Sequence, residues 1–181
     1  MIFRGLDIPG AFLIAPERME DERGFFARTF CEREFGDHGL CERFVQCSMS
    51  YNRRKGTLRG LHYQAPPHGE AKLVRCTMGA VWDVVADLRP GSPARGRWHA
   101  AELSAVNRAM VYVPEYVAHG FITLTDDSEV FYQMAGTYHA GAAAGVRWDS
   151  PSLGIAWPMV PTLMSERDAS LPLAGEDWTS G

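Results

Sequence analysis

The residues from Ala80 to Leu88 read AVWDVVADL and alternate along an extended chain, so that Asp83, Val85 and Asp87 fall on one side. Apolar alternation with a period of two predicts a β-strand rather than a helix. The next residues, Arg89–Pro93, read RPGSP, and this density of proline and glycine predicts that the strand ends in a turn. The dominant local pattern of the chain is therefore a short strand followed by a turn.

The same pattern recurs along the chain. Further strand-like runs cover Phe44–Ser50, Met110–Val113 and Glu129–Met134, and turn-forming runs cover Arg53–Gly56, Pro66–Gly69 and Thr125–Ser128. Many short strands separated by turns are typical of β-sandwiches and β-barrels, so we predict an all-β fold. Helix is expected only over Glu32–His38, ended by Gly39, and after Ser165, which could cap a turn through Arg167 and Asp168.

Composition narrows the class of protein. With 181 residues, 46% of them hydrophobic, the chain is expected to form one domain over 1–181, with a frayed tail after about residue 177. A net charge of −4 argues against general nucleic-acid binding, which needs a basic surface. Because no apolar run reaches roughly 18 residues and no secretory leader is recognisable, we expect no membrane span and a cytoplasmic protein. The four cysteines show no C-x-x-C spacing and are expected to be buried free thiols rather than disulfides or metal ligands.

Charged residues inside strand-like runs indicate a functional cavity. Arg59, His62 and Lys72 occupy such positions, and a lone buried charge is very costly unless it is paired or lines a solvated pocket. Arg59 and His62 have opposite parity, so a regular strand would point them to opposite faces. We therefore predict a bulge or kink at Gly60 that brings both side chains to one side. The alternative is that each is a hydrogen-bonded structural group.

The residue types favour acid–base chemistry over metal chemistry. The six histidines form no His-x-His or His-Glu-x-x-His motif, so no metal ligands are predicted. A histidine can remove or return a proton near neutral pH, a tyrosine can donate one, and a lysine can stabilise an oxyanion. These considerations leave the substrate open.

A set of ordered motifs carries a family resemblance. They are Asp21–Phe26 (DERGFF), Arg59–Gln64 (RGLHYQ), Lys72–Arg75 (KLVR), Asp87–Pro93 (DLRPGSP), His119–Phe121 (HGF), Tyr132, Trp148–Asp149, Trp157–Pro158 and Ser165–Asp168 (SERD). Through them the chain, from about residue 3 to about residue 172, resembles the dTDP-4-dehydrorhamnose 3,5-epimerase family.

The resemblance implies a cupin-type jelly roll that uses neither metal nor cofactor, in a homodimer with exchanged N-terminal strands. It also implies that the substrate is a nucleotide-diphosphate-linked 4-keto sugar, epimerised at C3, at C5 or at both. His62 would be the base, Asp168 its carboxylate partner, Tyr132 the acid on the opposite face of the ring, and Lys72 the group that stabilises the enolate. The substrate-binding set would be Arg23, Phe26, Arg28, Gln46, Ser48, Arg59, Lys72, His119, Tyr138 and Arg167.

Four positions differ from the pattern usual in this family. Arg28 and Glu70 replace Glu and Gln, Ser48 replaces Asn, and Ala142–Ala144 contains no acidic residue. Because arginine offers only donors, it cannot accept the N3–H of thymine, whereas it would suit the acceptors of cytosine or guanine. A CDP-, GDP- or other non-thymidine sugar therefore stays open, as do a 3-only or 5-only epimerase, a 3,4-ketoisomerase, a metal-dependent cupin and a non-catalytic binding module.

Overall fold

The computed structural model describes residues 1–175 and consists mainly of antiparallel strands. One sheet has six strands in the order β1 (Ile2–Gly5), β2 (Phe12–Ala15), β10 (Met110–Val113), β7 (Lys72–Met78), β12 (Ser128–Met134) and β5 (Gln46–Asn52). The other has five, in the order β13 (Ala143–Gly145), β6 (Leu58–Gln64), β11 (Val117–Thr123), β8 (Ala80–Asp87) and β9 (Trp98–Ser104). The predicted all-β fold is confirmed.

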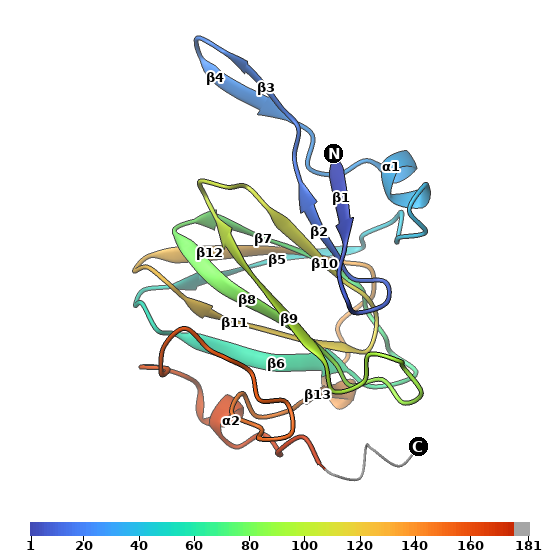
Figure 1. Ribbon diagram of the computed structural model, residues 1–181, viewed down its shortest axis with the longest axis vertical. Coiled ribbons are helices and arrows are strands. Elements are labelled where there is room, and N and C mark those ends of the chain that lie inside the picture. The colour runs from blue at the N-terminus through green and yellow to red at the C-terminus, as the bar shows by residue number, and fades with distance from the viewer. Residues whose placement is uncertain (176–181) are drawn as a thin grey trace.

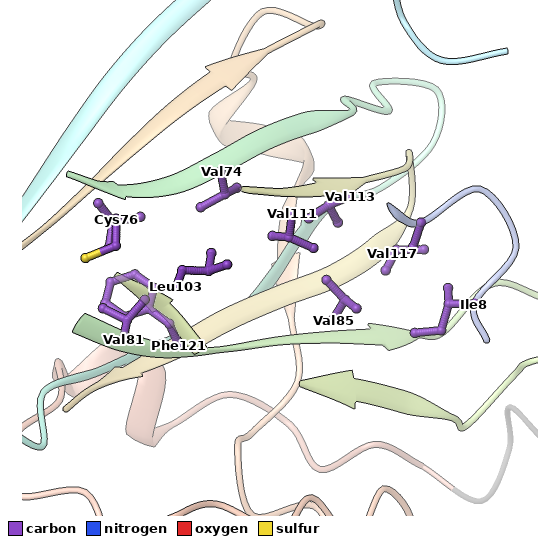
Figure 2. Packing of buried hydrophobic residues seen from close by; sticks show 12 residues of the cluster. Ile8, Val74, Cys76, Val81, Val85, Leu103, Val111, Val113, Val117 and Phe121 are labelled. Atoms are coloured by element: carbon purple, nitrogen blue, oxygen red, sulfur yellow. The ribbon is translucent and has the colours of Figure 1, made fainter. Parts of the chain in front are cut away.

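The two sheets face each other across an apolar core (Figure 2). The six-stranded sheet contributes Val74, Cys76, Val111 and Val113, and the five-stranded sheet contributes Val81, Val85, Leu103, Val117 and Phe121. Alternate residues of β8 point the other way, and Val84 and Ala86 pack on the outer face of their sheet. The alternation read from AVWDVVADL thus separates two buried faces rather than a buried face and a solvated one.

Two elements lie outside the sandwich. Within the described residues, the strands β3 (Arg18–Asp21) and β4 (Gly24–Ala27) pair only with each other, and they project away from both sheets (Figure 1). The short helix α1 (Glu32–Gly36) packs Phe35 against the outer face of the six-stranded sheet. This helix ends two residues before the predicted His38, in a turn that finishes at Gly39 with φ of +68°.

The C-terminal part of the chain covers β6 of the five-stranded sheet. A 3₁₀ turn spans Ala140–Ala142, and α2 spans Glu166–Ala169. Ser165 Oγ accepts the Asp168 N–H at 3.1 Å, which confirms the predicted cap. Single-domain organisation over 1–181 stays a prediction, and the tail after residue 177 lies outside the described residues.

β6 contains the irregularity predicted at Gly60. Its pairing with β11 joins His62 to His119 and Arg59 to Phe121, so three steps along β6 face two steps along β11. Gly60 has φ of +125°, and a Cβ there would lie 2.6 Å from the Gly120 Cα. Only glycine fits this conformation and this close approach. The extra residue turns Arg59 and His62 toward the same side.

Other sequence expectations concern thiols and membranes. All four cysteines are free, as predicted, but the expected burial holds only for Cys76, since Cys31 and Cys41 are half-buried and Cys47 is exposed. Within residues 1–175, no helix combines the length and apolar character that crossing a bilayer requires.

Candidate active site

A cavity of about 440 Å³ opens between the two sheets and is lined by residues of β6 and β11 on one side, by residues of β5, β7 and β12 on the other, and by residues of α2. Nine of the residues predicted for the site line it, namely Ser48, Arg59, His62, Lys72, His119, Tyr132, Tyr138, Arg167 and Asp168. The volume lies within the usual range for small-molecule sites. Residues that are far apart along the chain, from Ser48 to Asp168, therefore meet in one ligand-sized space.

His62 and Asp168 form a hydrogen-bonded pair at the cavity wall. His62 Nε2 lies 2.7 Å from Asp168 Oδ1, and the Gly60 N–H donates to Asp168 Oδ2 at 3.2 Å. Burial alone would raise the pKa of Asp168, but the interaction with His62 and the Gly60 N–H hold it below its ordinary value. An ionised Asp168 accepts the Nε2–H of a neutral imidazole, which leaves Nδ1 with its lone pair. Within residues 1–175, Nδ1 has no hydrogen-bond partner.

Tyr132 lines the same cavity from the opposite sheet. Its hydroxyl lies 3.2 Å from Ser50 Oγ, and its ring contacts His119 edge-on at a centroid distance of 6.2 Å. Burial raises the pKa of the Tyr132 phenol far above its ordinary value, although the hydrogen bond with Ser50 acts in the other direction. The phenol is therefore protonated at neutral pH and can act as a proton donor.

Lys72 supplies a positive charge beside Tyr132. In the ladder between β7 and β12, Tyr132 pairs with Val74 and Lys72 pairs with Met134, so Lys72 is a diagonal neighbour on the same face. Lys72 Nζ lies 3.2 Å from Glu70 Oε1, and both side chains are largely buried. An ammonium group in this position can stabilise an oxyanion that develops in the cavity.

A second histidine–aspartate pair lies deeper. His119 Nε2 is 2.8 Å from Asp83 Oδ2, and their side chains are only 5% and 1% exposed. Asp83 was not predicted as a site residue, although its inward position could be read from the alternation of AVWDVVADL. Ser50 was also missed, and its signal was the parity that it shares with the predicted Ser48.

Two arginines give the cavity a cationic side. Arg59 Nε donates to Asn52 Oδ1 at 2.7 Å, which orients the guanidinium along the wall, and Arg167 comes from α2. Guanidinium groups bind phosphate oxygens in paired hydrogen bonds. The arrangement can therefore accommodate an anionic group beside His62.

Four predicted binding residues lie outside this cavity. Arg23 and Phe26 belong to the β3–β4 hairpin, where Arg23 pairs with Asp21 and Phe26 is 69% exposed. Arg28 follows the hairpin and pairs with Glu34 at 3.0 Å. Gln46 acts indirectly, because its Oε1 accepts the backbone N–H of the cavity residue Tyr138 at 2.6 Å.

Residues 1–175 contain no group of three or more His, Cys, Asp or Glu side chains arranged to hold a metal ion.

Comparisons with known proteins agree with this geometry. Residues 5–176 match the family model described as dTDP-4-dehydrorhamnose 3,5-epimerase. The enzyme of that name from Sinorhizobium fredii is 43% identical over 173 residues, covering 95% of this chain and 89% of the relative. The crystal structure of the Elizabethkingia anophelis enzyme of that name superposes with a TM-score of 0.91 at 36% identity, over 95% of each chain.

A further solved structure contains a ligand. The dTDP-6-deoxy-D-glucose-3,5-epimerase of Legionella pneumophila, in complex with dTDP-4-keto-L-rhamnose, has a TM-score of 0.90 and 34% identity, covering 96% of this chain and 92% of that one. The likeness extends over nearly the whole chain in both sequence and fold, and it confirms the predicted jelly roll. This chain belongs to the dTDP-4-dehydrorhamnose 3,5-epimerase family.

Proposed function

We propose that this protein epimerises a nucleotide-linked 4-keto-6-deoxy sugar at carbons next to the carbonyl. The observation that carries the proposal is that His62 with Asp168, Tyr132 and Lys72 line one cavity from two facing sheets. A base and an acid on opposite sides of a ring can remove a proton from one face and return one to the other. Such an exchange inverts the carbon.

The proton transfers follow from the protonation states. A C4 ketone acidifies the hydrogens on C3 and C5, and the Nδ1 lone pair of His62 takes one of them. The C–H electron pair then forms the enolate double bond, and negative charge moves to the C4 oxygen, where Lys72 stabilises it. Tyr132 donates its hydroxyl proton to the opposite face of the carbon. The tyrosinate then recovers a proton from solvent, and His62 releases the one it took.

The nucleotide end of the substrate would lie along the arginines. Arg59 and Arg167 are well placed to bind the diphosphate, since both line the cavity beside His62. We propose a thymidine nucleotide, as in the names of the relatives. Arg28, the residue that suggested another base, is already engaged by Glu34 at 3.0 Å. Thermal shifts measured with dTDP, CDP, UDP and GDP test this choice, and a larger shift with any nucleotide other than dTDP would overturn it.

We also propose that the protein is a homodimer in which the β3–β4 hairpin of one subunit completes the cavity of the other. The hairpin carries Arg23 and Phe26 away from its own sandwich, whereas the Phe25 ring lies beside Arg108; Phe26 is 69% exposed and Phe25 44% exposed. The outer face of β5 adds exposed Met49 and Tyr51. Apolar surface of this kind is typical of a protein interface.

Mixing inactive subunits tests the exchange. The His62→Ala subunit retains a normal hairpin, and the Arg23→Ala/Phe26→Ala subunit retains a normal cavity. If hairpins serve the partner, a mixed dimer contains one complete site, and activity returns after the two variants are unfolded and refolded together. If each hairpin serves its own cavity, mixing restores nothing and the proposal fails.

Solvent exchange tests the reaction itself. The protein is incubated in D2O with dTDP-4-keto-6-deoxyglucose, and NMR follows deuterium at C3 and C5 together with the configuration of each carbon. Deuterium with inversion at either carbon is expected, and its position separates the 3-only, 5-only and double epimerases. A carbonyl that moves from C4 to C3 would indicate the ketoisomerase instead, and substrate bound without exchange would indicate a binding module.

A further inference from the structure

Glu70 carries a buried carboxylate oxygen that the proposed reaction does not use. The residue is 7% exposed and lines the cavity. Its Oε1 pairs with Lys72 Nζ at 3.2 Å, whereas its Oε2 is buried and has no hydrogen-bond partner within residues 1–175. An unpaired buried polar atom is costly, so its presence in a binding cavity indicates a donor that arrives with the ligand.

The backbone holds Glu70 firmly in this place. The ladder of β7 continues before Lys72, because the Ala135 N–H donates to the Ala71 carbonyl at 2.9 Å. Glu70 therefore shares the inward parity of Lys72. On the neighbouring segment a Cβ at Gly136 would lie only 3.0 Å from the Glu70 Cβ, so the glycine leaves the space that the Glu70 side chain occupies.

The chemistry of the pair restricts the ligand group. An ionised carboxylate only accepts hydrogen bonds, and an ammonium only donates them. Lys72 therefore offers a hydrogen-bond donor, and beside it Glu70 offers an acceptor. A ligand group that matches the pair has an acceptor for Lys72 next to a donor for Glu70. In a 4-keto-6-deoxy sugar the C4 ketone is such an acceptor. Of its two neighbouring carbons, C5 carries the methyl group and the ring oxygen, so only C3 carries a hydroxyl.

We propose that Glu70 is a substrate-binding residue whose Oε2 accepts the hydrogen bond of the C3 hydroxyl while Lys72 contacts the C4 oxygen. Glu70 then selects sugars that have a hydrogen-bond donor on the carbon next to the ketone. This inference rests on the proposed function, because the position of the ketone beside Lys72 is part of it.

A fluorine analogue and an isosteric variant test the proposal together. A 3-deoxy-3-fluoro sugar nucleotide keeps the approximate size of the C3 substituent but lacks the donor. Hydrogen bonds to charged groups contribute enough that the unmodified protein should bind the fluoro sugar about 10- to 100-fold more weakly than the hydroxy sugar. Because Lys72 can only donate hydrogen bonds, the amide of Glu70→Gln turns its oxygen toward Lys72 and its N–H group toward C3. Its N–H group can still donate to the C3 hydroxyl oxygen, a neutral hydrogen bond, so this variant should keep only a smaller preference for the hydroxy sugar, of about three- to tenfold.

A matched control separates the local effect from the loss of a charge. Glu129 lies on the same sheet outside the cavity, where its Oε1 accepts from Thr77 Oγ1 at 2.7 Å. Glu129→Gln removes the same charge and should keep the discrimination of the unmodified protein. Dissociation constants from calorimetry and melting temperatures from scanning fluorimetry are measured for all three proteins.

Deuterium incorporation at both C3 and C5 of the hydroxy sugar is recorded beside the binding data, so that an epimerase acting at either carbon is detected. If the unmodified protein catalyses deuterium exchange but binds both sugars with equal affinity, the role of Glu70 is overturned and the proposed function stands. If the unmodified protein prefers the hydroxy sugar as expected but catalyses no deuterium exchange, the binding role of Glu70 is supported and the proposed function is contradicted. An equal ratio in the unmodified protein and Glu70→Gln would also overturn the inference.

Discussion

The histidines of the two histidine–aspartate pairs lie on adjacent strands and differ chiefly in burial. His62 and His119 face each other as Cα partners of β6 and β11, and each places Nε2 within 2.7 or 2.8 Å of a carboxylate oxygen. The His62 side chain is 35% exposed, whereas the His119 side chain is 5% exposed. The same pair of residues therefore occurs once at the surface of the cavity and once in its floor.

The difference arises from the elements that supply the carboxylates. Asp168 comes from α2, a short helix outside the sheet, so its pair with His62 lies at the edge, where a ligand can approach. Asp83 comes from β8, the strand hydrogen-bonded to β11, so its pair with His119 lies within the sheet. We infer that access rather than residue type separates a proton-transferring histidine from one that mainly shapes the cavity beside Tyr132.

Replacing each histidine by alanine should give the largest contrast. His62→Ala removes the base and should reduce deuterium exchange at C3 and C5 by about 10³-fold or more, since general base catalysis contributes on that scale. His119→Ala should reduce exchange only about tenfold, mainly by disturbing the cavity. NMR of the product in D2O measures both. Near-normal exchange in His62→Ala would show that the base is misassigned.

The aspartates should divide in the same way. Asp168→Asn disturbs the tautomer and orientation of His62, so kcat should fall by about 10² to 10³-fold, with a loss of stability below about 1 kcal/mol. Asp83→Asn leaves a buried histidine with a poorer partner and should cost about 1–3 kcal/mol of stability. Steady-state kinetics and urea unfolding are compared for the two variants. An equal loss of kcat in both would contradict the division.

Tyr132→Phe should separate proton removal from proton return. The variant keeps the ring against His119 but loses the donor, so net inversion should fall by about 10²-fold, and deuterium exchange at the same carbon should fall less. Ser50→Ala removes only the hydrogen bond to Tyr132 and should have a small effect on both rates. Parallel losses of exchange and inversion in Tyr132→Phe would argue that the phenol is not the returning acid.

Acidification should weaken the pair of Asp168 and His62, and this is the smallest of the expected effects. Because the pKa of Asp168 is below its unfolded value of roughly 3.9, the ionised carboxylate stabilises the folded state at neutral pH. That contribution is lost as pH falls below the unfolded pKa and through the lower folded pKa. Melting temperatures from pH 7 to pH 3 should therefore fall more for the unmodified protein than for Asp168→Asn. A gap that stays constant across this range would contradict the role of ionisation.

Local features of the sequence predicted much of the fold. The strand Met110–Val113 was predicted with the bounds that the structure has, because turn-forming residues limit a short apolar run. Gly60 was predicted from a parity conflict between Arg59 and His62, and the structure contains the extra residue that resolves it. Such features depend on neighbours within a few positions of the chain.

The sequence by itself determined the alternation of strands and turns, the kink at Gly60 and, through its motifs, the family and the set of candidate side chains. Only the tertiary structure decided that Glu70 forms an ion pair with Lys72 and that Asp83 pairs with His119. It also decided that Arg23 and Phe26 lie away from the cavity of their own chain. The physical reason is that hydrogen bonds and ion pairs between strands depend on register and on the packing of two sheets. Residues far apart in the chain meet only when both are established.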